Sequence, residues 1–198
     1  MAKLLNWVSL AKKIRTAGLT VFTPQDVLHL SGSTEVSVRF LLTRAVKRGD
    51  CLKLRRGVYT LAEFLPTEME LANALYRPSY ISFAFALSYY QLIPETVYTI
   101  ASATTRTTAT FAALEKQFVY HRLKPQVFTG YQMALIQQRR VAIADPEKAL
   151  VDALYFVVLH KWEIPERLQT RTLSKSKVRA LAKLFVQPDL EQLVEKTL

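Results

Sequence analysis

The segment from Leu52 to Leu61 constrains the fold of this chain more than any other, through its own pattern and through what precedes it. Leucines alternate with basic residues in Leu52-Lys53-Leu54-Arg55, Arg56-Gly57 reverses the chain, and Val58-Tyr59-Thr60-Leu61 has strand propensity. The pattern predicts a short antiparallel hairpin with a basic tip. Three predicted helices come directly before it, so residues 1–62 have the element order of a winged helix–turn–helix domain.

The first two helices are indicated by apolar spacing and by residues that begin and end helices. Residues 3–17 carry apolar side chains at helical spacing, and Gly18 stands where a glycine commonly ends a helix. Thr23-Pro24 is a helix start, because threonine caps well and proline loses nothing in the first turn. The short helix that follows stops at Ser31-Gly32.

The third helix is capped by Ser33 or Thr34 and runs to about Arg48, where Gly49 closes it. Its wheel separates two faces. The stripe expected to pack on the first two helices is Val38, Leu41, Leu42 and Ala45. The opposite side carries Val36, Ser37, Phe40, Thr43, Arg44 and Lys47.

In a helix–turn–helix domain the N-terminal half of this helix meets base edges, while basic residues flank the DNA backbone. We therefore expect base contacts from Thr34, Ser37 and Phe40, with Phe40 available for a thymine methyl group. Arg55 and Arg56 are expected to reach a minor groove or its phosphates. The further residues expected at DNA, mostly at phosphates, are Arg39, Thr43, Arg44, Lys47, Arg48 and Lys53.

Charge agrees with this pattern. Residues 1–62 hold 11 Lys/Arg against three acids, whereas the remaining residues hold 16 against 13, so +8 of the net +11 belongs to the first third. A polyanion such as double-stranded DNA is the partner that such a surface fits. Two plainer interpretations stay open: a basic helix face that is only solvated, and a winged helix that binds a protein.

Composition limits the number of domains and argues against disulfide-bonded, metal-binding and membrane-spanning classes of protein. At 198 residues, half of them apolar, the chain suits one large or two small domains with a real core. The single Cys51 excludes an intrachain disulfide and suits a reducing, cytoplasmic compartment. The histidines (His29, His121, His160) are too scattered for a metal site, so no cofactor is expected. No apolar run reaches the roughly 20 residues of a membrane span, and no membrane partner is expected.

A proline and three acids in residues 63–70 mark the boundary with a second domain, residues 63–198. Strands followed by helices predict an α+β domain with a small mixed sheet and C-terminal helices. The expected strands are 97–102, 117–123, 127–128 and a hairpin of 134–137 with 140–144 around Gln138-Arg139. The expected helices include one from Asp145-Pro146 to about His160 and a helical C-terminus with starts at Pro165 and Pro188.

Catalytic patterns in this second domain are weak, and we expect no enzyme. A nuclease would need a carboxylate two residues before a lysine near another acid, which neither Glu115-Lys116 nor Asp145-Pro146-Glu147-Lys148 provides. Asp145 and Glu147 are better explained as acids at a helix start. Ser82, His121 and Asp152 lack the glycine turn that presents a nucleophilic serine. The segment Thr104–Thr110, with Arg106 at its centre, is expected to be a polar loop.

Two further motifs carry a resemblance. The run Tyr80-Ile81-Ser82 with Ala86-Leu87-Ser88-Tyr89-Tyr90-Gln91-Leu92-Ile93-Pro94 resembles the signature of the AbiEi family of type IV antitoxins. So does Ala144-Asp145-Pro146-Glu147-Lys148-Ala149-Leu150-Val151-Asp152, and Arg55-Arg56-Gly57-Val58-Tyr59 lies where that family has its wing. The resemblance covers about residues 1–160 and leaves the helices of residues 161–198 without an assigned role.

The resemblance implies a transcriptional repressor that binds repeats in the operator upstream of its own operon. It also implies that this operon encodes a nucleotidyltransferase-like toxin, which the second domain counteracts. The competing hypothesis is a protein-interaction module, whose winged helix contacts a protein partner rather than DNA.

Overall fold

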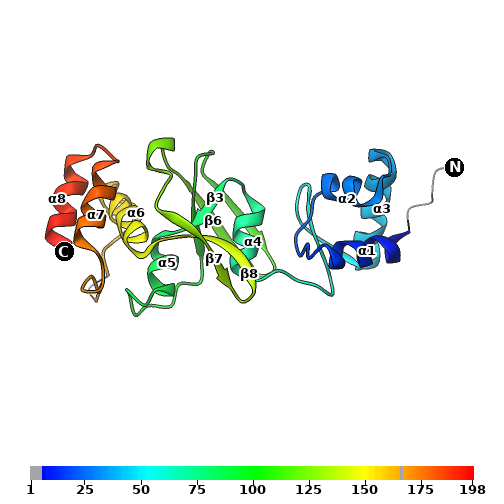
Figure 1. Cartoon of the computed structure of the whole chain (residues 1–198), viewed down its shortest axis with the longest axis horizontal. Helices are drawn as coiled ribbons and strands as arrows, with labels where there is room; N and C mark the ends of the chain where they lie inside the picture. Colours follow the sequence, from blue (N-terminus) through cyan, green and yellow to red (C-terminus); the bar gives the residue numbers. More distant parts are fainter. Residues whose placement is uncertain (1–5, 166) are drawn as a thin grey trace. The chain divides into compact units, whose positions relative to one another are not determined.

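The computed structural model describes residues 6–165 and 167–198, and in it the chain divides into two compact units, one ending at Thr67 and one beginning at Glu68 (Figure 1). The structure is mixed α+β. Residues 3–5 of the expected first helix lie outside the described residues.

The first unit consists of three helices followed by a two-stranded antiparallel hairpin. The helices are α1 (Trp7–Thr16), α2 (Pro24–Ser31) and α3 (Glu35–Arg48), and the strands are β1 (Cys51–Arg55) and β2 (Val58–Leu61). These are the predicted elements in the predicted order. The chain reverses at Gly57, whose φ of 77° is a conformation that glycine adopts without the strain a side chain would add.

Local side-chain chemistry explains where α2 begins and ends. Thr23 accepts a hydrogen bond from the backbone N–H of Asp26, and the Asp26 carboxylate accepts one from the Thr23 N–H, which is a complete capping box. Gly32 ends the helix with a φ of 63°. Helices α2 and α3 are therefore separated by a short turn formed by Gly32, Ser33 and Thr34.

The core of the first unit is a single apolar cluster that joins all of its elements. Its buried members are Leu10, Ala11, Ile14, Phe22, Val27, Val38, Leu42, Ala45, Cys51 and Leu61. Because every helix and the hairpin contribute to this cluster, the polar faces of the same elements are turned outward.

The second unit is a six-stranded mixed sheet in the strand order β5-β6-β4-β3-β8-β7. The strands are β3 (Ser79–Ile81), β4 (Ile100–Thr104), β5 (Ala109–Ala113), β6 (Lys116–Arg122), β7 (Tyr131–Ile136) and β8 (Arg139–Ala144). Two pairings, β3 with β8 and β4 with β6, are parallel, and the other three are antiparallel.

Helices cover both faces of this sheet (Figure 1). One face bears α4 (Glu68–Leu75), where the Tyr120 hydroxyl donates a 2.5 Å hydrogen bond to the carbonyl oxygen of Ala72. The other face bears α5 (Phe83–Tyr89) and α6 (Pro146–Val158), which receive Tyr80 and His121 from the sheet. Behind α6 lie α7 (Lys175–Lys183) and α8 (Pro188–Thr197).

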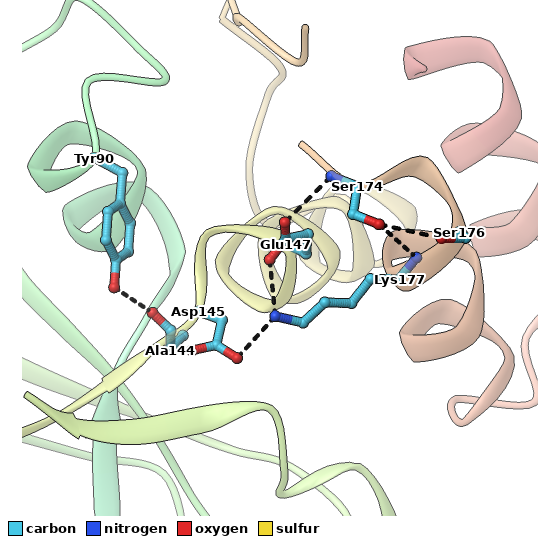
Figure 2. A network of polar contacts seen from close by, with 7 residues as sticks. All are labelled: Tyr90, Ala144, Asp145, Glu147, Ser174, Ser176 and Lys177. Atoms are coloured by element: carbon cyan, nitrogen blue, oxygen red, sulfur yellow. Dashed lines mark hydrogen bonds and ion pairs between the residues drawn. The ribbon is translucent and has the colours of Figure 1, made fainter. Parts of the chain in front are cut away.

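A polar network attaches α7 to the start of α6 (Figure 2). The Lys177 ammonium lies 3.0 Å from a carboxylate oxygen of Asp145 and 3.0 Å from one of Glu147. The backbone N–H of Ser174, the residue that caps α7, donates a 3.2 Å hydrogen bond to Glu147. Asp145 occupies the capping position of α6 but makes no side-chain cap bond. Its carboxylate pairs with Lys177 instead of capping the helix.

Four expectations about the second unit need correction. The expected strand at Val127–Phe128 is a 3-10 helix, Pro125–Val127, because one buried apolar side chain after a proline does not need a strand to bury it. The expected polar loop Thr104–Thr110 runs into a strand, β5, made mostly of small residues. Its weak pattern is that of an edge strand, which pairs on one side only.

The β7–β8 hairpin is present, but it turns at Gln137 and Gln138, one residue earlier than expected, with φ values of 49° and 62°. Pro165 does not begin a helix. Between α6 and α7 the described residues form no helix, so the C-terminal segment is less helical than its composition predicted.

Candidate nucleic-acid interface

Helix α3 has one buried and one exposed face, as its sequence pattern predicts. Val38, Leu42 and Ala45 are buried in the core, and Leu41 is half-buried against it. The exposed side chains include every α3 residue expected at DNA, together with the cap: Thr34, Ser37, Arg39, Phe40, Thr43, Arg44, Lys47 and Arg48. The helix is thus anchored along one side and free along the other.

The N-terminal turn of α3 carries a small hydroxyl network. Thr34 caps the helix by accepting a hydrogen bond from the Ser37 N–H, and the hydroxyl groups of Thr34 and Ser37 lie 3.0 Å apart. Each hydroxyl can donate one hydrogen bond and accept two, so both keep capacity for an external partner. This network sets the orientation of the two side chains before any ligand arrives.

Two apolar side chains project beside these hydroxyls. Val36 is 64% exposed and Phe40 is 59% exposed, and they lie four residues apart, one turn of the same helix. An exposed apolar pair in the middle of a charged face is a contact surface for a partner with apolar groups of its own. Sequence analysis placed Val36 on this face but gave it no role.

The cations of α3 lie between Arg39 and its C-terminal end. Arg39, Arg44 and Lys47 are exposed, and none of them forms an ion pair within the described part of the chain. Arg48 differs, because its guanidinium lies 2.8 Å from the carboxylate of Asp50 and its charge is largely offset. Thr43 donates its hydroxyl proton to the Arg39 carbonyl oxygen at 2.8 Å, which leaves it only acceptor capacity.

The hairpin presents its basic residues unequally. Lys53 and Arg56 are exposed, whereas Arg55 is half-buried next to the irregular register between Lys53 and Arg55. Leu54 and Val58 are buried, and Cys51 and Leu61 join the hairpin to the core. Arg56 at the turn is therefore freer to reach a ligand than Arg55, although sequence reasoning treated them alike.

A short backbone bridge fixes the hairpin relative to the helices. Phe22, just before α2, exchanges two 2.9 Å backbone hydrogen bonds with Tyr59 in β2, and the two rings stack at 6.2 Å. The hairpin thus has a third extended segment beside it. This arrangement limits how far the tip can move away from α3.

The second unit holds a separate polar cluster, which is closed to solvent. Tyr80, Ser82, Lys148 and Asp152 are each at most 1% exposed. The Asp152 carboxylate accepts hydrogen bonds from Ser82 at 2.7 Å, Tyr80 at 3.1 Å and the Lys148 ammonium at 2.5 Å. The segments around Tyr80-Ile81-Ser82 and Lys148–Asp152 therefore meet at one carboxylate.

His121 is not part of this cluster. Its ring lies 5.0 Å from that of Phe83 and 4.6 Å from that of Phe156, both measured between centroids. Ser82 is engaged with Asp152 instead of with the histidine, so the three residues weighed as a triad do not form the hydrogen-bonded chain that a triad requires.

No protein-family model matches the chain, and no curated protein matches it either. The resemblance to the AbiEi family therefore stays a prediction. Within the range that the structure covers, no helix is both long and apolar enough to cross a membrane.

Proposed function

We propose that the first unit is a winged helix–turn–helix domain that binds double-stranded DNA, with α3 as its recognition helix. The observation that carries the proposal is the exposed face of α3, which combines hydroxyls and Phe40 with the cations Arg39, Arg44 and Lys47. Base edges are read by the first kind of side chain and phosphates by the second.

The element order supports this proposal. A short helix, a three-residue turn containing Gly32 and a longer helix are followed at once by the hairpin with Arg56 at its tip. The excess charge of +8 on residues 1–62 supports it as well, because DNA carries one negative charge per about 1.7 Å of helix axis.

In the wider role that we propose, the protein represses transcription by occupying an operator upstream of its own operon. Occupation alone blocks a promoter, so the mechanism uses no cofactor. From the resemblance we add that the protein is the antitoxin of a type IV toxin–antitoxin pair and that the second unit counteracts a nucleotidyltransferase-like toxin. Growth of cells that express such a toxin from the same operon, with and without the second unit, tests this addition.

The first experiment is fluorescence anisotropy of the full chain with duplex DNA from upstream of its gene. A random duplex of equal length is the control. Specific binding should exceed random binding by about a thousandfold or more at physiological salt. The logarithm of affinity should fall linearly with the logarithm of salt concentration, with a slope of roughly 0.9 per neutralised phosphate.

Two matched variants distinguish a specific contribution of the hairpin tip to DNA binding from the general effect of net charge. Arg56→Glu reverses an exposed charge at the hairpin tip, and Lys12→Glu reverses an exposed charge on α1. Both change the net charge equally. We expect Arg56→Glu to weaken binding strongly and Lys12→Glu to weaken it much less.

Equal losses of DNA affinity in Arg56→Glu and Lys12→Glu would indicate that the first unit offers DNA only a nonspecific basic surface. If neither duplex binds at all, the competing protein-interaction hypothesis replaces DNA binding.

A further inference from the structure

The sheet of the second unit is built from a segment with very few acids. Residues 71–144 contain seven Lys/Arg and two acids, Glu95 and Glu115, whereas residues 145–198 contain nine Lys/Arg and eight acids. The excess positive charge of this unit therefore belongs to the sheet and its loops, not to the C-terminal helices.

Three of these cations gather at one end of the sheet. Ser79, Thr104 and Arg122 form one row across the adjacent strands β3, β4 and β6. Arg77 lies two residues before this row and Arg106 two residues after it. Since neighbouring strands are about 4.8 Å apart, the three arginines start from backbone positions close to one another. We call Arg77, Arg106 and Arg122 the arginine cluster.

Neutral groups hold the Arg106 side chain and the backbone of Arg122 in place. The Arg106 guanidinium lies over the ring of Tyr76, 4.4 Å from its centroid, and donates a 3.3 Å hydrogen bond to the carbonyl oxygen of Arg77. Tyr76 is buried, and its hydroxyl lies 3.1 Å from that of Thr107. The backbone N–H of Arg122 donates to the Thr108 hydroxyl at 3.3 Å. Arg106 is thus oriented before any ligand binds.

No carboxylate in the part of the chain that the structure describes pairs with these charges. All three arginines are exposed, and none forms an ion pair in residues 6–165 and 167–198. Other cations of the unit do pair, as Lys116 does with Glu68 at 3.0 Å. Gathering like charges without partners works against folding, so the arrangement is explained better by a ligand than by stability.

We propose that the arginine cluster is a second phosphate-binding surface of this protein, which contacts the backbone of duplex DNA. Guanidinium groups bind phosphate oxygens bidentately, and the exposed hydroxyls of Thr107 and Thr108 add donors beside them. The choice of DNA as the polyanion rests on the proposed function of the first unit. The existence of the site rests on the cluster alone.

The test compares two triple variants of the full chain by anisotropy on a random duplex at several salt concentrations. Arg77→Gln/Arg106→Gln/Arg122→Gln removes the cluster. Arg171→Gln/Lys183→Gln/Lys196→Gln removes three exposed charges elsewhere on the same unit. We expect the cluster variant to lose about tenfold to a hundredfold in affinity and its salt slope to fall by about 2–3. The control variant should keep its salt slope.

Thermal unfolding of the same variants separates binding from folding. The cluster variant should melt at the same temperature as the unchanged protein or higher, because repulsion is relieved. Since Arg106 packs on Tyr76, the double variant Arg77→Gln/Arg122→Gln leaves that contact intact and should still lose affinity. Equal effects of the cluster and control variants on the salt slope would overturn the proposal.

A variant of the first unit, Arg39→Gln/Arg44→Gln/Arg56→Gln, makes the two proposals separable. If this variant loses DNA while the cluster variant binds normally, the second surface is refuted and the proposed function stands. If the cluster variant alone loses DNA, the second surface stands and the recognition role of α3 is refuted. Failure of the unchanged protein to bind any duplex refutes both.

Discussion

The hydroxyl of Ser82 donates a 2.7 Å hydrogen bond to the carboxylate of Asp152, although 70 positions separate the two residues in the sequence. Ser82 stands directly before α5 and Asp152 lies within α6, so the bond ties these two helices together. Burial raises the pKa of Asp152, and the Lys148 ammonium opposes that rise. The carboxylate is accommodated in the core only because three donors surround it.

Breaking this buried ion pair from one side should be strongly destabilising. Lys148→Met leaves a buried carboxylate without its cation, and we expect a loss of about 3–5 kcal/mol in the free energy of unfolding. Asp152→Asn leaves the ammonium unpaired and should also destabilise. The double variant should lose less than the sum of the singles by about 0.5–3 kcal/mol, measured by urea unfolding. Strict additivity would show that the pair is not coupled.

His121 should make stability depend on pH near neutrality. Burial lowers its pKa below the ordinary 6.5, and the nearby Lys161 lowers it further. Just below pH 6.5, His121 therefore binds a proton in the unfolded chain but stays neutral in the folded chain. The contribution of His121 to the free energy of unfolding should be constant above pH 6.5 and fall as the pH drops toward the folded pKa. His121→Phe should remove this part of the decline, as urea titrations on both sides of pH 6.5 would reveal; parallel curves for both proteins would contradict it.

The Lys177 contacts with Asp145 and Glu147 should matter at neutral pH and vanish in acid (Figure 2). Burial by itself would raise the pKa of Glu147, but hydrogen bonds from Lys177 and from the backbone lower it below 4.5. Its contribution is therefore complete above pH 4.5 and lost as the pH falls through the folded pKa. Because Lys177 is about half exposed, Lys177→Gln should cost only about 0.2–1 kcal/mol. Arg171→Gln, another exposed cation, is the control, and an undiminished difference in acid would contradict the assignment.

Cys51 should be unreactive in the folded protein. Its side chain, at the start of β1, is fully buried in the core of the first unit, and burial raises the pKa of the thiol to about 12. Only the thiolate attacks disulfide reagents, so almost none of the reactive form exists at neutral pH. An aromatic disulfide reagent should label one thiol per chain at once in denaturant and only slowly without it. Fast labelling under native conditions would show that the hairpin opens readily.

The two halves of α3 should have different effects on DNA binding. Phe40→Ala should weaken binding to the specific duplex by about 1–3 kcal/mol and leave random duplex unchanged, because it removes an apolar contact to bases. Arg44→Gln should weaken both duplexes and lower the salt slope by about 1. Competition between labelled and random duplex measures the difference. If the two changes altered binding to the specific and random duplexes in the same way, α3 would not be divided into residues that contact bases and residues that contact phosphates.

The elements of the first unit could be predicted from sequence because local chemistry decides them. The capping box of Thr23 and Asp26, the glycines that end α2 and α3, and the apolar stripe of Val38 and Leu42 all act within a few residues. Such signals are complete in a short window of sequence. The unequal burial of Arg55 and Arg56 was missed because it depends on the register irregularity in β1.

The second unit was predicted less well, because its elements depend on distant partners. Strand β5 has small residues and no strong strand pattern. It forms because its backbone pairs with that of β6 in an antiparallel arrangement. The 3-10 helix at Pro125 replaced an expected strand for a similar reason: one buried valine can be accommodated by several local conformations.

The sequence by itself therefore determined the helices and the hairpin of the first unit, the outward face of α3 and the uneven distribution of charge, since period, caps and composition are local properties. Only the tertiary structure decided which distant side chains meet. It brought Tyr80 and Ser82 to Lys148 and Asp152 in the core, and it placed Arg77, Arg106 and Arg122 at one end of the sheet. The physical reason is that strand order and register set these meetings, and neither is encoded in any single segment of the chain.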